Sequence, residues 1–362
     1  MKAVYDLMQR GVVDGVFPGG VLLAAREGRV LFLDAFGLAR ITPKRPMTVD
    51  TVFDLASLTK PLATTLALML LVETGRLHLE QGLASAVSSF SGTHKQAVTI
   101  RQLLSHASGL PDYRPYYRKL SKIEPSGRKD ALRALLVAEP LIAEPGNISL
   151  YSDVGFMILE WVVEVVAKKP LDRFVEETVY EPLGLRHLFF IPLFEGKKRN
   201  GLSYAATEQC PWRQEIMDGQ VHDDNAYVVG GVGGHAGLFG TAQDIHGLLE
   251  ELLITYHGRE GTGLFEQHVV QTFLKRQSDT GTWALGFDTP TRPDSSSGRH
   301  FSDQSVGHLG FTGTSFWMDL EKEVIIILLT NRIHPSRENE RIKDFRPLLH
   351  DAVMEAILSA AT

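Results

Sequence analysis

Two stretches near opposite ends of the chain have the pattern of a β-hairpin, and together they restrict the fold more than any other feature. Near the N-terminus, VLLAAREGRVLFLDAFG contains two apolar runs around a Glu27-Gly28 turn. Near the C-terminus, FWMDLEKEVIIILLTN (316–331) has a second such pattern, with its turn at Glu321-Lys322. Because few strand patterns lie between them, we predict one sheet assembled from the two ends of the chain.

The middle of the chain has the spacing of amphipathic helices, with apolar residues at i, i+3 and i+4. The segments are PLATTLALMLLVETGRLHL, IRQLLSHASGL, KDALRALLVAEPL, GFMILEWVVEVVAKK and LDRFVEETVYEPLGL. Helical spacing also covers residues 2–16 and the C-terminal RENERIKDFRPLLHDAVMEAILSAA. We therefore predict an α/β (α+β) chain, in which residues 1–56 and 240–362 combine into a sheet domain and residues 57–239 form a mostly helical insertion.

The composition excludes several classes of protein. Lys and Arg number 37 and Asp and Glu 43 among 362 residues, so the formal net charge of −6 lacks the positive excess that drives nucleic-acid binding. The single Cys210 excludes an intrachain disulfide. The start has no secretory pattern, and the longest apolar runs are far shorter than the roughly 20 residues of a membrane span. We predict a cytoplasmic protein with neither nucleic acid nor a membrane as partner.

Ser57 and Lys60 stand at the start of the apolar stretch FDLASLTKPLATTLALMLL (53–71). On a helix, positions i and i+3 share a face, so the lysine amine can reach the serine hydroxyl and help to remove its proton. Pro61 is tolerated in the first turn of a helix, which places the helix start near Ser57. The same spacing recurs at Ser126 and Lys129 in a polar stretch, so a capping serine with a solvated lysine stays an open interpretation of the spacing alone.

Two further motifs accompany this pair: the Tyr-Ser-Asp of LYSDVGFMILEWVVEVV (150–166) and the His-Leu-Gly of GHLGFTGTSFWMDL (307–320). Together the three resemble the active-site motifs of the serine β-lactamase and penicillin-binding protein (DD-peptidase) superfamily, above all its class C, esterase and aminopeptidase branch. LLSHASGLPDY, EPGNISLYSD and EPLGL are similar to the same branch. The resemblance runs from about residue 18 to the C-terminus. It implies a β-lactamase/transpeptidase-like fold, with an antiparallel sheet flanked by helices and the active site in the cleft beside a helical domain.

The resemblance also implies a role for individual residues. Ser57 would be the nucleophile that accepts the acyl group, Lys60 its proton partner, and Tyr151 a second base or acid. The backbone N–H groups of Ser57 and Phe311 would form the oxyanion hole. Which of Lys60 and Tyr151 is the general base stays open, as it does for related enzymes. No cofactor or metal is implied.

Two positions depart from the family pattern. His308, followed by Gly310, stands where β-lactamases have the lysine and glycine of Lys-Thr-Gly, and a neutral histidine recognises a substrate carboxylate less well. This argues against potent β-lactamase activity. Asp153 stands where the family often has Asn, and its charge would favour a protonated Lys60 and a larger role for Tyr151. A simple ion pair that holds Lys60 is an equally good interpretation.

The segment DGQVHDDNAYVVGGVGGHAGLFGTAQDI (218–245) resembles one found in a sub-branch linked to muropeptide recycling, which includes N-acetylmuramoyl-L-alanine amidases. His222 and Asn225 would then line the cleft and bind polar groups of the substrate. Alternatively, the segment is a structural loop whose acids cap turns. A metal site from His222, Asp223 and His235 lacks the usual zinc spacing.

From these features we predict a serine hydrolase that acts through an acyl-enzyme on an amide, namely a peptidoglycan-derived muropeptide. A carboxylesterase or a weak class C-type β-lactamase is the alternative enzyme. A catalytically idle penicillin-binding or sensing module is the alternative without catalysis, and it predicts the loss of at least one of Ser57, Lys60 and Tyr151, all of which are present.

Overall fold

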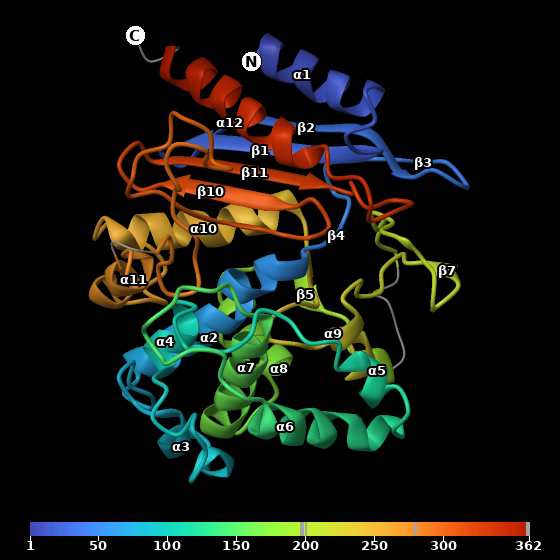
Figure 1. The fold of residues 1–362 in the computed structure, drawn as a ribbon. Coiled ribbons are helices and arrows are strands. Elements are labelled where there is room, and N and C mark those ends of the chain that lie inside the picture. Colours follow the sequence, from blue (N-terminus) through green and yellow to red (C-terminus); the bar gives the residue numbers. More distant parts are fainter. Residues whose placement is uncertain (196–198, 200, 279–280, 360–362) are drawn as a thin grey trace.

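The sheet predicted from the two ends of the chain is present in the computed structural model, which describes residues 1–195, 199, 201–278 and 281–359 (Figure 1). It is a six-stranded sheet with the order β3-β2-β1-β11-β10-β9, and the neighbouring strands are antiparallel. The strands are β1 (Gly19–Arg26), β2 (Arg29–Arg40), β3 (Arg45–Pro46), β9 (Val306–Leu309), β10 (Ser315–Asp319) and β11 (Val324–Thr330). The two ends meet where β1 pairs with β11, from Gly20 opposite Thr330 to Arg26 opposite Val324.

Both predicted hairpins are confirmed. Glu27 and Gly28 join β1 to β2 with φ values of 50° and 76°, and two positive φ values are typical of the tight turn that matches the twist of a hairpin. The second turn joins β10 to β11 and ends at Glu323, which has φ of 52°.

Alternating side chains of the sheet face two different layers, as a strand period of two requires. Val324, Ile326 and Leu328 of β11 pack in one cluster with α1 (Lys2–Val13) and α12 (Ile342–Leu358). The intervening residues Ile325, Ile327 and Leu329 belong to the large cluster on the other face, which includes α10 (Ala242–Tyr256). Figure 1 shows α1 and α12 above the sheet, and α10 with α11 (Gln267–Leu274) below it.

The helical middle of the chain is also confirmed. Its longer helices are α2 (Leu66–Glu73), α6 (Arg128–Ala138) and α7 (Asp153–Ala167), and its shorter ones are α3 (Leu83–Ala86), α4 (Ile100–Leu104), α5 (Tyr117–Leu120), α8 (Leu171–Val175) and α9 (Asp224–Val228). A 3-10 turn (Ala56–Leu58) and a π-helical stretch (Lys60–Thr65) lead into α2.

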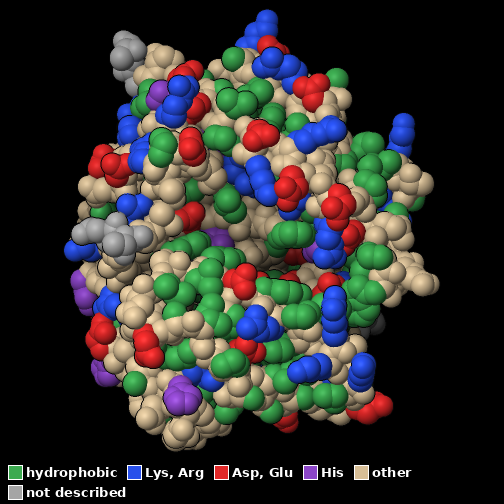
Figure 2. All heavy atoms as spheres, in the orientation of Figure 1, with side chains coloured by type: hydrophobic (Ala, Val, Ile, Leu, Met, Phe, Trp, Pro, Cys, Tyr) green, Lys and Arg blue, Asp and Glu red, His purple; other side chains and the backbone are tan. Residues whose placement is uncertain are grey.

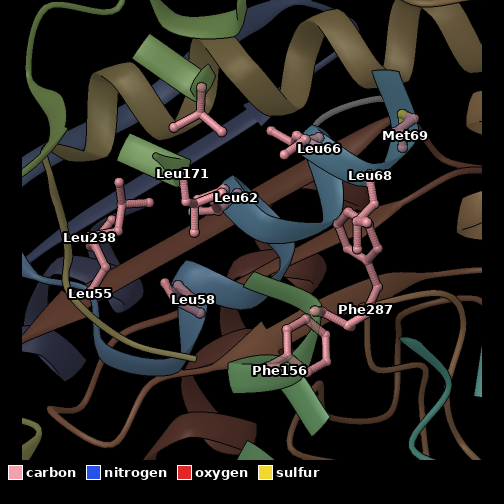
Figure 3. Close-up of a cluster of buried hydrophobic side chains, with 14 of the residues drawn as sticks. Leu55, Leu58, Leu62, Leu66, Leu68, Met69, Phe156, Leu171, Leu238 and Phe287 are labelled. Carbon is pink, nitrogen blue, oxygen red and sulfur yellow. The ribbon is translucent and has the colours of Figure 1, made fainter. Parts of the chain in front are cut away.

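The 3-10 turn and the π-helical stretch extend α2 toward the N-terminus, so the continuous helix is longer than the apolar segment in the sequence. Ala56–Glu73 is long and apolar enough to cross a membrane by length and composition, yet 78% of it is buried inside the protein. Its side chains Leu58, Leu62 and Leu68 project to different sides into the surrounding hydrophobic cluster (Figure 3). This apolar segment is therefore the central helix of the hydrophobic core.

Two small sheets within residues 53–240 were not predicted. One has the order β4-β8-β5, from β4 (Phe53–Asp54), β8 (Leu238–Gly240) and β5 (Leu188–Phe190), and the other pairs β6 (Gln209–Cys210) with β7 (Glu215–Ile216). Strands of two or three residues are too short to show a period. The first small sheet matters for the site, because β4 ends just before Ser57 and pairs with β8.

Candidate active site

Ser57 lies in a tight turn that is held on both sides. The preceding Ala56 has φ of 48°, which few residues with a side chain adopt. Its N–H donates to Asp54 Oδ1 at 2.9 Å, and Thr59 Oγ1 donates to the Ala56 carbonyl at 2.6 Å. Ser57 therefore stands inside a 3-10 turn ahead of the helix, one turn before Lys60, with little freedom to move.

Lys60 is fully buried, and its ammonium nitrogen has three partners. Nζ lies 2.7 Å from Asp153 Oδ1, 3.1 Å from Ser57 Oγ and 3.1 Å from the carbonyl oxygen of His235. Nζ donates hydrogen bonds to Ser57 and His235, while Asp153 balances its charge as an ion pair. In this state Lys60 donates to the serine hydroxyl and has no lone pair with which to accept its proton.

Tyr151 and Asp153 are positioned by the start of α7. The Ser152 side chain caps this helix by accepting from the N–H of Gly155 at 3.0 Å, so Tyr151 precedes the cap and Asp153 occupies the first turn. Lys60 Nζ lies 4.8 Å from the centroid of the Tyr151 ring, and Tyr151 lines the same pocket as Ser57. The helix start thus delivers a carboxylate and a phenol to the same lysine.

Three rings surround Tyr151. Trp283 stacks on it with the ring centroids 5.4 Å apart, and the rings of His106 and His308 lie at 4.7 and 5.9 Å. His106 Nδ1 accepts from the N–H of Ser152 at 3.0 Å, so this histidine supports the turn that carries Tyr151. The Tyr151 ring is consequently fixed on several sides.

His308 lies in β9, with its ring held by the neighbouring backbone. Its Nδ1 is 2.9 Å from the carbonyl oxygen of Leu309; a carbonyl can only accept, so we assign the proton to Nδ1. Nε2 then carries a lone pair, and it has no hydrogen-bond partner among the described residues. His308 also lines the pocket at Ser57.

Gly310 allows the end of β9 to approach the Ser57 turn. A side chain here would place Cβ 2.6 Å from the carbonyl oxygen of Leu55 and closer still to Thr314 Oγ1. The following Phe311 is 48% exposed at the pocket, and its N–H makes no backbone hydrogen bond to a described residue. Arg332 donates through Nε to the Phe311 carbonyl at 3.0 Å, which holds the peptide that follows Phe311.

The charges of the site are set by burial and by Asp153. Burial acts to lower the pKa of Lys60, but the Asp153 carboxylate and Tyr151 outweigh it, so the pKa is raised and the amine is protonated. Burial raises the pKa of Tyr151, the Lys60 charge opposes this and Asp153 adds to it, so the phenol is neutral. Burial and the charge of Lys60 lower the pKa of His308 to about 3, so its imidazole is neutral as well.

A pocket of about 340 Å³ opens at Ser57. Its wall includes Tyr151, Trp283 and residues 308–311 at the end of β9, together with Arg332 and the first turns of α12. Figure 2 shows the molecule hollowed at the middle of this face, between the part that contains the sheet and the helical part. The pocket thus lies in a cleft that both parts line.

Two of the predicted site residues have side chains that are bonded elsewhere. His222 Nε2 is 3.0 Å from Glu208 Oε2, and its ring stacks on Phe311 at 5.6 Å between centroids. The Asn225 amide accepts from the N–H of Tyr117 and donates to the carbonyl of Arg114. Both are buried and neither lines the pocket at Ser57, whereas Ser57, Tyr151, His308, Gly310 and Phe311 do.

Asp223, which lies between His222 and Asn225 in the sequence, forms an ion pair with His235. Asp223 Oδ1 lies 2.9 Å from His235 Nε2 and also accepts from the N–H of Ala226 as the cap of α9. The carbonyl of the same His235 accepts from Lys60. Within the described residues no group of three or more metal-ligating side chains occurs, so His222 does not join this pair as a metal site.

Several residues of the site were not predicted from the sequence. Trp283 and Arg346 belong to no motif and reach the pocket only through the fold. His235 contributes a backbone carbonyl, which leaves no trace in the residue type. The sequence signal that could have identified Arg346 is that this basic residue falls among the apolar positions of α12 that are buried.

A protein-family model described as Beta-lactamase matches residues 4–349 of the chain. Among curated proteins, the chain is 34% identical over 355 residues to a "Putative D-alanyl-D-alanine carboxypeptidase" of Escherichia coli (strain K12), covering 89% of this chain and 80% of that protein. It is 33% identical over 366 residues to an "N-acetylmuramyl-L-alanine amidase" of Bacillus subtilis (strain 168), covering 92% and 81% respectively.

Solved structures with the same fold include enzymes and penicillin-binding protein homologues. "EstCE1, a hydrolase with promiscuous acyltransferase activity" is 26% identical, with a TM-score of 0.72 over 96% of this chain and 98% of that one. The penicillin-binding protein homologue from Pyrococcus abyssi is 18% identical, with a TM-score of 0.74 over 99% of this chain and 77% of that one. The second likeness concerns the fold alone.

Proposed function

This chain belongs to the β-lactamase family of serine hydrolases, and from that premise we propose that it cleaves an amide of a peptidoglycan-derived muropeptide through an acyl-enzyme on Ser57. The observation that carries the proposal is the contact between Ser57 Oγ and a lysine that is buried and paired with Asp153. If Ser57 were only a helix cap and Lys60 only a solvated residue, Lys60 would not need to be buried.

In the proposed acylation, Tyr151 first loses its phenolic proton to water. Ser57 Oγ then forms a bond to the carbonyl carbon of the substrate amide, and the serine proton passes to the Tyr151 phenolate. The argument for Tyr151 is that Asp153 keeps Lys60 protonated, so that its ammonium donates to Ser57 and has no lone pair to accept the serine proton. The Lys60 charge stabilises both the phenolate and the serine oxygen. Tyr151 then returns the proton to the departing amine as the C–N bond breaks.

The proposed oxyanion hole consists of the N–H groups of Ser57 and Phe311. Two observations support this assignment: the Phe311 N–H has no backbone partner among the described residues, and Gly310 lets its peptide approach the Ser57 turn. Water then attacks the acyl-enzyme, with Tyr151 as base again, and the carboxylic acid leaves. Once Tyr151 is ionised, its phenolate takes up and returns the proton at each step of this cycle.

The substrate rests on the relatives as well as on the site. A curated relative at 33% identity bears the name of an N-acetylmuramyl-L-alanine amidase, and others bear that of a D-alanyl-D-alanine carboxypeptidase, so amides of cell-wall peptides recur among the names. His308, neutral where β-lactamases carry a charged lysine, supports an amidase over a potent β-lactamase.

A mass-spectrometric turnover assay on a muramoyl-L-alanyl peptide tests the proposal. Wild type is expected to cleave the amide between the lactyl group and alanine, and Ser57→Ala is expected to be inactive with a nearly unchanged melting temperature. Cleavage at a different amide would assign the chain to another peptidase activity. No cleavage of any peptide amide, with the fold intact, would overturn the amidase proposal.

An esterase is the second candidate. The neutral His308 and the 26% identity to EstCE1, a hydrolase by its title, favour it. Turnover of short-chain esters without any cleavage of muropeptides would select this function. Both candidates require Ser57, so the substrate panel and not the Ser57 variant separates them.

A further inference from the structure

The glycine-rich segment that carries His235 packs against α7 at very close range. A side chain at Gly234 would place Cβ 2.2 Å from the carbonyl oxygen of Phe156 and 2.8 Å from Glu160 Cβ. Only a residue without a side chain fits between this segment and the helix. The glycine at this position is therefore explained by the close approach of two backbones.

Buried side chains hold Gly234 by both of its backbone groups. Its N–H donates to Glu160 Oε2 at 3.0 Å, and its carbonyl oxygen accepts from Thr64 Oγ1 at 2.7 Å. Glu160 is only 3% exposed, and Thr64 is fully buried. The next residue is His235, whose carbonyl oxygen accepts from Lys60 Nζ at 3.1 Å. The two contacts at Gly234 thus fix the backbone one residue before the carbonyl that binds Lys60.

Glu160 and Asp153 lie on the same face of α7, because seven residues make about two helical turns. Asp153 in the first turn pairs with Lys60 directly, and Glu160 two turns later reaches Gly234. Figure 1 shows α7 beside α2, and the π-helical stretch that leads into α2 contains both Lys60 and Thr64. The helix α7 therefore supports Lys60 at two points, once by a direct ion pair and once through the backbone of the glycine-rich segment.

Glu160 shares its basic partner with a second acid of α7. Lys129 Nζ bonds with Glu160 Oε1 and lies 3.0 Å from Glu164 Oε1, and Arg133 lies 2.6 Å from Glu164 Oε2. A carboxylate is costly to bury unless it is paired and hydrogen-bonded, and Lys129 supplies the opposite charge. Among the described residues, only Glu160 of this pair of acids also bonds with the backbone of Gly234.

We propose that Glu160 is a positioning residue for the reaction at Ser57, because it holds the Gly234 backbone so that the His235 carbonyl accepts from Lys60. With this acceptor in place, the ammonium keeps the direction in which it also donates to Ser57 Oγ. Glu160 does not line the pocket at Ser57, so it acts through Lys60 and not on the substrate. The inference rests on the proposed function only in taking Ser57 as the nucleophile.

The test compares Glu160→Leu with Glu164→Leu. Both remove a carboxylate that pairs with Lys129, and only the first removes a contact with Gly234. The rate at which a fluorophosphonate modifies Ser57 is measured well below the melting temperature of each variant. Glu160→Leu should lower this rate at least about tenfold, and Glu164→Leu should stay within about twofold of wild type. Equal losses in the two variants, or a wild-type rate in Glu160→Leu, would overturn the inference.

Glu160→Gln separates the hydrogen bond from the charge. The amide oxygen of glutamine can still accept from the Gly234 N–H, so this variant should keep the rate within about threefold of wild type. A merely structural ion pair with Lys129 would lower the melting temperature in both variants of Glu160 and leave the rate of the folded protein unchanged. A glutamine variant as slow as the leucine variant would assign the effect to the charge and overturn the inference.

Thr64→Val decides the matter if Glu160→Leu does not fold. Valine has nearly the shape of threonine and removes only the hydroxyl that holds the Gly234 carbonyl. The modification of Ser57 should then slow at least about fivefold. A wild-type rate in this variant would show that the hold on Gly234 does not position Lys60.

The position of the His235 carbonyl is a readout that needs no reaction. In crystal structures, its distance from Lys60 Nζ should stay near 3.1 Å in wild type and in Glu164→Leu. In Glu160→Leu it should exceed the hydrogen-bond range of about 3.5 Å, and an unchanged distance would overturn the inference. If wild type does not react with the fluorophosphonate, the proposed function fails, and this distance still decides whether Glu160 positions the acceptor of Lys60.

Discussion

The carboxylate of Asp153 lies 2.7 Å from the buried ammonium of Lys60 and, against the effect of burial, raises the pKa of this lysine. With Asp153 ionised, Lys60 keeps its proton and donates to Ser57 Oγ. In the proposed mechanism the acceptor is then Tyr151, which lines the same pocket as Ser57.

Asp153→Asn should shift the pH dependence of acylation to lower pH. The carboxylate raises the pKa of Lys60 and also that of Tyr151, so its removal lowers both. Whichever group is the base, a larger fraction is deprotonated at neutral pH, so the rise of the rate with pH moves to lower pH. The measurement is the rate at which a fluorophosphonate modifies Ser57, as a function of pH. A profile that stays in place or moves up contradicts the ion-pair argument.

Tyr151→Phe should slow acylation by about two orders of magnitude or more, the usual contribution of a general base. The substitution removes only the hydroxyl, and the ring keeps its contacts with Trp283 and His106, so the melting temperature should hardly change. Stopped-flow acylation measures the effect. A rate near that of wild type would remove Tyr151 from the mechanism and return the base role to Lys60.

Gly310→Ala should lower kcat by about two to three orders of magnitude, as the loss of an oxyanion donor does. The new methyl group would stand 2.6 Å from the Leu55 carbonyl, so β9 must withdraw from the Ser57 turn and carry the Phe311 N–H with it. Gly127→Ala, where the added carbon meets only Ile123 at 3.4 Å, is the control. Comparable kcat values for the two variants would argue against an oxyanion hole at Phe311.

The sequence predicted the parts of the site that follow a local rule. The Ser57–Lys60 spacing is a helical i, i+3 pair, and the Glu27-Gly28 turn is determined by its own residues, so both could be found without the fold. Arg346 lies far from the other site residues in sequence, and only the packing of α12 on the sheet brings it to the pocket. The His235 carbonyl is invisible in a pattern of side chains.

The segment that contains Asp223 shows the limit of a resemblance. Its similarity to recycling amidases does not by itself decide between a substrate-binding segment and a structural loop. The structure adds the His235 pair and the cap of α9. The two interpretations then predict different pH dependences of stability.

Asp223→Asn tests them, because asparagine preserves the cap and removes the charge. Burial acts to lower the pKa of His235, but Asp223 outweighs it and raises the pKa, so the pair stabilises the fold below the usual value of 6.5 and loses this contribution as pH rises through the raised value. The His235 pair holds the pKa of Asp223 below 3.8, against burial, so the carboxylate is ionised throughout this range. Wild type should therefore lose unfolding free energy from about pH 6.5 upward, and Asp223→Asn should show a flatter profile.

Urea denaturation across that range measures the difference, and Asp223→Ala, which also loses the cap, should be less stable than Asp223→Asn by about 1 kcal/mol. A structural loop predicts these stability changes with KM nearly unaltered once the protein is folded. A substrate-binding loop predicts a raised KM for the muropeptide in Asp223→Asn with little change in the pH profile of stability. The ion pair at 2.9 Å and the buried His235 favour the first outcome.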